Sequence, residues 1–166
     1  MSDTLVPERQ ASLAWSDALL LELDFMDDTH REFVDFLAAV ETSDDEMLVE
    51  RFSALVDHTD EHFGGEDRWM AATQFAASNC HTMQHNVVMQ VLREALKRGQ
   101  EGDLVLLRDL SRELGIWFAQ HAQSMDAALA LHLRQIGFDP VTGVVHRPDA
   151  LPEGEIHGCG GSSCSS

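Results

Sequence analysis

A histidine and a glutamate stand four residues apart in the stretch HFGGE, which runs from His62 to Glu66. Imidazole and carboxylate groups both bind metals, and residues four apart lie on the same face of an α-helix. Between them are Gly64 and Gly65, each of which costs a helix roughly 1 kcal/mol relative to alanine. Metal binding contributes free energy to folding and can offset that cost, so the stretch indicates a metal site with open space beside it.

Three other segments carry ligand-type residues at related spacings. HTMQH contains His81 and His85, HAQSMD contains His121 and Asp126, and MDDTHREF contains His30. When each segment is drawn as a helix, these histidines fall on its apolar stripe. Asp126 lies about 100° from the centre of its stripe, so we expect it to reach in from the side.

Five histidines and two carboxylates in apolar stripes need a shared partner. A buried polar group without a hydrogen bond costs about 1–3 kcal/mol, and an isolated carboxylate costs more. One buried histidine is more commonly a satisfied core residue than a ligand, but seven such groups on four segments favour metal binding. Two carboxylates that can bridge favour two metal ions, and nitrogen and oxygen donors without thiolate favour iron or manganese over structural zinc.

Four helical segments must position these side chains. Short links between them predict an all-α fold, an up-down-up-down antiparallel four-helix bundle. We expect residues 1–138 to form this domain, with residues 1–23 as an arm packed along the bundle. Residues 139–166 are rich in Gly, Pro and Ser without periodicity, which predicts a flexible tail. Apolar periodicity places the helices at about residues 24–41, 45–72, 78–98 and 103–135.

Composition excludes several classes of partner. The chain has 11 Lys and Arg against 29 Asp and Glu, a formal net charge of −18, which argues against binding nucleic acid or anionic membranes. No apolar run is long enough to span a bilayer and no signal peptide is apparent, so we expect a cytoplasmic protein. Its three cysteines do not form a disulfide framework. We expect Cys80 to be a partly buried thiol, because it lies about 100° round the helix from His81.

With these four motifs the sequence resembles the hemerythrins, and more closely the single-domain bacterial hemerythrins. Their ligands are a lone His on the first helix, HxxxE on the second, HxxxH on the third and HxxxxD on the fourth. All seven positions match, and the resemblance covers about residues 12–136. It implies a non-haem diiron centre with an oxo or hydroxo bridge that cycles between Fe2+ and Fe3+ and binds O2 reversibly. One iron would be held by His81, His85 and His121. The other would be held by His30 and His62 with one position open to O2, and Glu66 and Asp126 would bridge the two.

The resemblance also implies a dry apolar pocket around the centre, lined by Phe33, Phe63, Trp117, Phe118 and Met125. The expected role is O2 storage, delivery or sensing rather than catalysis, with O2 as the partner and a monomer favoured over an oligomer. Two alternatives stay open. One is a diiron redox enzyme acting on peroxide, nitric oxide or ferrous iron. The other is a metal-handling protein that uses the tail HGCGGSSC, although composition favours a disordered end with two exposed thiols for this segment. The lack of a spare carboxylate or tyrosine on the inner stripes favours O2 binding.

Overall fold

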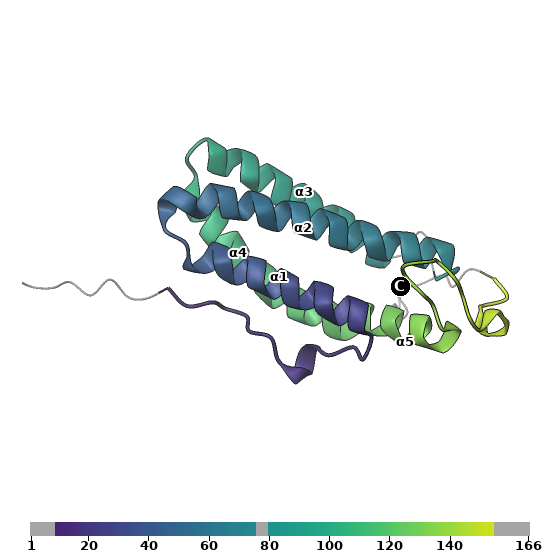
Figure 1. Ribbon diagram of the computed structural model, residues 1–166. Helices are drawn as coiled ribbons and strands as arrows, with labels where there is room; N and C mark the ends of the chain where they lie inside the picture. Colours follow the sequence, from purple (N-terminus) through teal and green to yellow (C-terminus); the bar gives the residue numbers. More distant parts are fainter. Residues whose placement is uncertain (1–8, 76–79, 155–166) are drawn as a thin grey trace, which may run out of the picture.

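The computed structural model describes residues 9–75 and 80–154, and within these ranges the fold is all-helical, without a β-strand. The long helices run alternately in opposite directions, as Figure 1 shows, so the predicted antiparallel four-helix bundle is confirmed. None of the helices in the described ranges combines the length and the apolar character that a bilayer span requires. The long helices are α1 (Asp24–Thr42), α2 (Asp45–Ala72), α3 (Cys80–Gln100) and a fourth stretch made of α4 (Leu104–His121), a π-turn (Ala122–Asp126) and α5 (Ala127–Ile136).

Short capped links set the order of the helices. The Asp44 side chain accepts a hydrogen bond from the backbone N–H of Met47 at the start of α2, 3.0 Å away. The Asp103 side chain does the same for Leu106 at the start of α4, at 3.2 Å. Such caps satisfy N–H groups that the first helical turn leaves unpaired. Gly137, with φ of 62°, ends α5 in the left-handed conformation that glycine adopts most readily.

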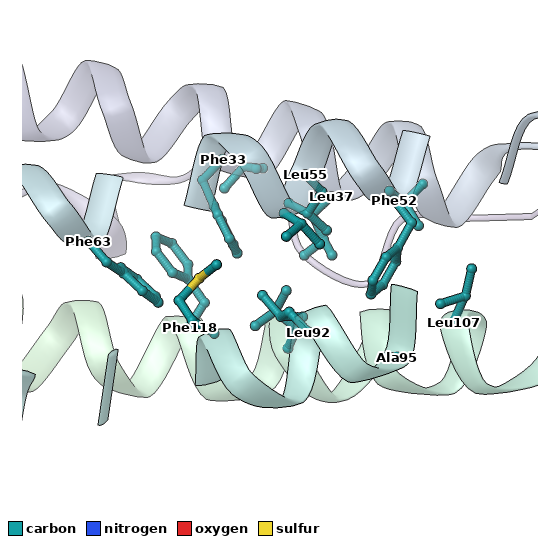
Figure 2. Packing of buried hydrophobic residues seen from close by; sticks show 14 of the residues in the cluster. Phe33, Leu37, Phe52, Leu55, Phe63, Leu92, Ala95, Leu107 and Phe118 are labelled. Atoms are coloured by element: carbon teal, nitrogen blue, oxygen red, sulfur yellow. The ribbon is translucent and has the colours of Figure 1, made fainter. Parts of the chain in front are cut away.

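Apolar side chains fill the bundle on both sides of the polar cluster. Figure 2 shows the larger set, in which Phe33, Phe52 and Phe118 are fully buried. A second set, which includes Met26 and Leu129, fills the other end. On α1, α2 and the fourth stretch, the ligand-type residues come between members of these two sets in the sequence. The polar cluster therefore lies inside the bundle with apolar packing on either side.

The arm expected at residues 1–23 lies, from residue 9 on, along the bundle (Figure 1). The Trp15 ring lies under the guanidinium carbon of Arg31, 4.6 Å from its centroid. Asp27, buried on α1, accepts hydrogen bonds from the backbone N–H groups of Leu21 and Leu23, at 2.8 and 3.2 Å. These contacts hold the arm against α1 one turn before His30.

The first part of the predicted tail is more regular than its composition indicates. Phe138 and Val145 form an isolated antiparallel bridge, and Pro148–Ala150 form a 3-10 turn. The backbone N–H of Arg147 donates to the carbonyl of Ile136 at 2.9 Å, which joins this hairpin to the end of α5. The segment HGCGGSSC lies outside the described residues.

Candidate metal centre

All seven predicted ligand residues lie together inside the bundle and are buried. Their nitrogen and oxygen atoms form two groups, and within each group these atoms lie within 4.8 Å of one another. Both carboxylates, Glu66 and Asp126, belong to both groups. The cluster is therefore a pair of adjacent sites that share two carboxylates. One group adds His30 and His62, and the other adds His81, His85 and His121.

The fourth helical stretch differs from the continuous α-helix predicted for residues 103–135. Five residues of α-helix would place Asp126 about 140° away from His121. The structure instead has a π-turn, in which the N–H of Ala127 donates to the carbonyl of Ala122 five residues earlier. The hydroxyl of Ser124 binds the carbonyl of Gln120 at 2.7 Å and so competes with the regular backbone pattern. The turn brings Asp126 Oδ1 to 3.0 Å from His121 Nε2, which places both residues in the cluster.

Two histidines of the cluster face each other through their Nε2 atoms. The Nδ1 of His85 lies 2.9 Å from Asp67 Oδ1, and the Nδ1 of His121 lies 3.2 Å from Gln84 Oε1. Both oxygens are acceptors, so each Nδ1 carries a proton, and in the neutral form of either ring the lone pair is on Nε2. Burial lowers the pKa of His85, which keeps its ring neutral. The two Nε2 atoms nevertheless lie 3.1 Å apart, an arrangement that a cation between the rings would stabilise.

Other close contacts in the cluster lack hydrogen-bond geometry. His30 Nε2 lies 3.2 Å from Asp126 Oδ2, and His81 Nε2 lies 3.0 Å from Asp126 Oδ1. None of these four atoms has a hydrogen-bond partner, and neither does Glu66 Oε2. Each such buried atom costs free energy that ligation to a metal would recover. The residues present therefore fit a metal pair.

The charges of the cluster also indicate cation binding. Burial by itself would lower the pKa values of His30 and His81, but the carboxylates of Asp126 and Glu66 raise them to about 9 and about 10. Burial would raise the pKa values of Glu66 and Asp126, but the surrounding imidazoles lower both well below their ordinary values. Without metal, two protonated imidazoles therefore balance two carboxylates, and metal ions would compete with those protons.

A family model described as Hemerythrin HHE cation binding domain matches residues 21–131. The chain belongs to the hemerythrin family. A bacteriohemerythrin of Ralstonia nicotianae is 37% identical over 127 residues, which cover 76% of this chain and 93% of that protein. A bacteriohemerythrin of Stenotrophomonas maltophilia is 26% identical over 141 residues, which cover 80% of this chain and 92% of that protein. Together, the hemerythrin family and the buried cluster indicate a metal-binding site.

Aromatic rings surround this hemerythrin site much as predicted. Phe63 stacks on His85 with ring centroids 4.0 Å apart, and Trp117 stacks on His121 at 4.4 Å. Phe118 stacks on Phe33 and meets His30 edge-on. Met125, the fifth predicted lining residue, is only half-buried. The rings keep water from the imidazoles on the side of the larger apolar set.

Two residues that contact predicted ligands of this hemerythrin chain were not identified from the sequence, Asp67 and Gln84. Each is next to a ligand in the sequence, yet each binds a histidine on a neighbouring helix: Asp67 on α2 binds His85 on α3, and Gln84 on α3 binds His121 on α4. One indication of Asp67 was present in the sequence, a second carboxylate directly after the predicted ligand Glu66. Asp67 lies about 100° round the helix from Glu66 and so falls outside the inner stripe, where ligands were expected.

Two other residues of this hemerythrin chain with metal-binding side chains, His132 and Cys80, are not part of the cluster. His132 is buried at the end of the bundle, where its Nε2 lies 3.2 Å from the carbonyl of Thr73 and its ring stacks on Phe75. It takes no part in the metal cluster. The interpretation of Cys80 as a thiol is wrong, because Cys80 is disulfide-bonded.

Proposed function

We propose that this protein binds O2 reversibly at a pair of non-haem iron ions bridged by Glu66 and Asp126. The observation that carries the proposal is the pair of ligand groups that share both carboxylates, with the Nε2 atoms of His85 and His121 only 3.1 Å apart. Nitrogen and oxygen donors without thiolate suit iron. Membership of the hemerythrin family supports the same role.

The two iron positions differ in their protein ligands. His81, His85 and His121 would hold one iron, and His30 and His62 would hold the other, with both carboxylates shared. The second position has one imidazole fewer, which leaves room for a small molecule. When bound, the iron pair supplies the reversible one-electron change at each ion that O2 binding requires.

The protein's own side chains would set the conditions for reversibility. Phe33, Phe63 and Phe118 are buried and exclude water, which withholds protons and polar solvent from the site. Asp67 and Gln84 hold the rings of His85 and His121 in the tautomer that presents Nε2. These residues together favour binding and release of O2 over its reduction.

The function is tested by titrating the ferrous protein with O2 in a closed cell and recording visible spectra. We expect a new absorption band that saturates and that disappears under argon over repeated cycles. An irreversible spectral change, or none, would reject reversible binding.

One observation favours the second candidate, a redox enzyme. The described residues include ionisable side chains, His58 and Glu61, in a cavity that reaches His62 and Glu66. They could exchange protons with a bound substrate. Rapid turnover of hydrogen peroxide by the iron-loaded protein, at a rate that falls in a His58→Ala variant, would favour this candidate.

Metal binding is expected to release protons. At pH 7, His30 and His81 are protonated in the metal-free protein, because their pKa values are about 9 and about 10. Loading with Fe2+ should therefore release on the order of two protons per chain. The release should decrease, and the affinity should rise, as the pH approaches 9 to 10. Calorimetric titrations in two buffers of different ionisation enthalpy measure the release, and an unchanged heat in the two buffers would contradict it.

Removal of the Asp67 side chain is expected to weaken metal binding. Asp67→Ala deprives His85 Nδ1 of its acceptor, and loss of such a partner typically costs roughly 10–100-fold in affinity. Competition between the metal-free protein and a chromophoric chelator for Co2+ measures this. Asp60→Ala is the matched control, since Asp60 is on the same helix but pairs with Arg93 at the surface. Equal affinities for the two variants would show that Asp67 has no such role.

A further inference from the structure

A cavity of about 500 Å³ lies between α1 and α2 and reaches the metal cluster. These two helices pack side by side in Figure 1. Glu32 on α1 and His58 and Glu61 on α2 line it, together with Gly65. His62 and Glu66, both proposed ligands, form its buried end. The cavity therefore connects exposed ionisable groups with the His30 and His62 side of the cluster.

The mouth of the cavity presents two acceptors to each other. His58 Nε2 donates to the carbonyl of Thr29 at 3.3 Å, so His58 Nδ1 carries a lone pair. That nitrogen lies 3.8 Å from Glu32 Oε2. Glu61, next to the proposed ligand His62 in the sequence, lines the same mouth. An imidazole lone pair beside two exposed carboxylates is a donor set for a divalent cation.

The buried end of the cavity contains a histidine with an unpaired nitrogen. The His62 side chain is 3% exposed and its Nδ1 has no hydrogen-bond partner, whereas its Nε2 lies 3.0 Å from Oε1 of Glu66. A cation that passed the mouth would meet these two residues next. Arg68, the one cationic side chain among the described lining residues, extends over Gly64, where its Nη1 would lie 3.2 Å from an added Cβ.

Gly65 keeps this end of the cavity open. An added Cβ there would come no closer than 3.8 Å to Trp69, which is ordinary contact, so alanine fits without strain. Alanine also favours the helix over glycine. A glycine that packing does not require, in the wall of a cavity beside the ligands, is consistent with a need for space.

We propose that this cavity is the route by which divalent first-row cations load the centre, with Glu32, Glu61 and His58 as transient ligands at its mouth. The inference rests on the proposed metal centre. The charged lining suits a hydrated ion better than it suits O2, which partitions into apolar surroundings. Aromatic packing by Phe33, Phe63 and Phe118 fills the bundle on the other side of the cluster.

The test is stopped-flow uptake of Co2+ by the metal-free, full-length protein, followed by cobalt absorption. The double variant Glu32→Gln/Glu61→Gln should slow uptake about tenfold at low ionic strength, and the effect should shrink as salt screens the mouth. Its matched control is Glu46→Gln/Glu50→Gln, which removes the same charge from exposed positions of α2 outside the cavity lining. The control should load at nearly the normal rate.

A second pair of variants tests the path itself. Gly65→Ala should slow uptake severalfold at any salt concentration, whereas Gly64→Ala should not, because Gly64 does not line the cavity. Cobalt stoichiometry at equilibrium should be unchanged in all four variants. Uptake at the normal rate in both Glu32→Gln/Glu61→Gln and Gly65→Ala would overturn the proposal. Slower O2 association with normal cobalt uptake would also overturn it and make the cavity a gas route. Failure of the unaltered protein to take up cobalt would instead reject the metal centre.

Discussion

Glu66→Ala is expected to leave the purified protein without stoichiometric iron. Glu66 belongs to both ligand groups, so its removal takes a donor from each iron position at once. It also leaves the imidazoles of His30 and His62 without a carboxylate that lies 3.7 and 3.0 Å from them. Loss of a single positioning partner costs roughly 10–100-fold in affinity, so loss of a shared ligand should cost more than about 100-fold. Elemental analysis after iron loading and desalting measures the result.

Glu50→Gln is the control for this experiment, because Glu50 is an exposed acid on the same helix. It should retain the iron content and the O2 spectrum of the unaltered protein. Full iron content in Glu66→Ala would mean that the iron lies elsewhere in the chain. A folded Glu66→Ala variant, confirmed by its helical circular dichroism, is needed for this comparison.

Removal of the metal by a chelator is expected to lower the melting temperature on the order of 10 °C. Ligand present at 1,000 times its Kd stabilises a fold by about 4 kcal/mol, and each kcal/mol shifts Tm by roughly 2–4 °C for a chain of this size. The physical cause is the cluster itself, whose buried atoms lack hydrogen-bond partners when no cation joins them. Thermal unfolding followed by circular dichroism, with and without chelator, measures the shift.

The metal-free fold should in turn depend on pH. Because the pKa values of His30 and His81 are raised to about 9 and about 10, their protonation stabilises the metal-free protein fully below about pH 6.5. That contribution is lost as the pH rises through 9 and 10. Re-addition of Fe2+ after removal of the chelator should restore the original Tm. Identical melting curves with and without metal would show that the cluster adds no stability.

Apolar periodicity was sufficient to predict the four helices and the face that each predicted ligand other than Asp126 occupies. His62 and Glu66, for example, share the stripe of α2 with Phe52 and Leu55, and all four are buried. Regular α-helical geometry applies to these residues, so position in the sequence translates directly into direction around the axis.

For Asp126, the direction around the helix axis cannot be calculated from its position in the sequence. Its contact with His121 depends on a π-turn, and the angle calculated for an α-helix is wrong for any residue beyond the turn's start. The roles of Asp67 and Gln84 depend on the rotation of α2 against α3 and of α3 against α4, which one helix's periodicity does not define. The hairpin after α5 is held by single backbone contacts. These contacts produce no repeating pattern in the sequence from which the hairpin could be predicted.

The two glycines of HFGGE have different surroundings in the structure. Gly65 lines the cavity, whereas Gly64 lies under the Arg68 guanidinium and does not. The expectation that the pair leaves space near the centre therefore applies to one of the two. At Gly64 an added Cβ would press on the flexible end of Arg68, which can move aside.

X-ray absorption at the iron edge of the loaded protein tests the central claim most directly. We expect only nitrogen and oxygen atoms bound to the iron, imidazole scattering, and a second iron near the first. Isolated iron ions, or sulfur bound to the iron, would contradict this expectation.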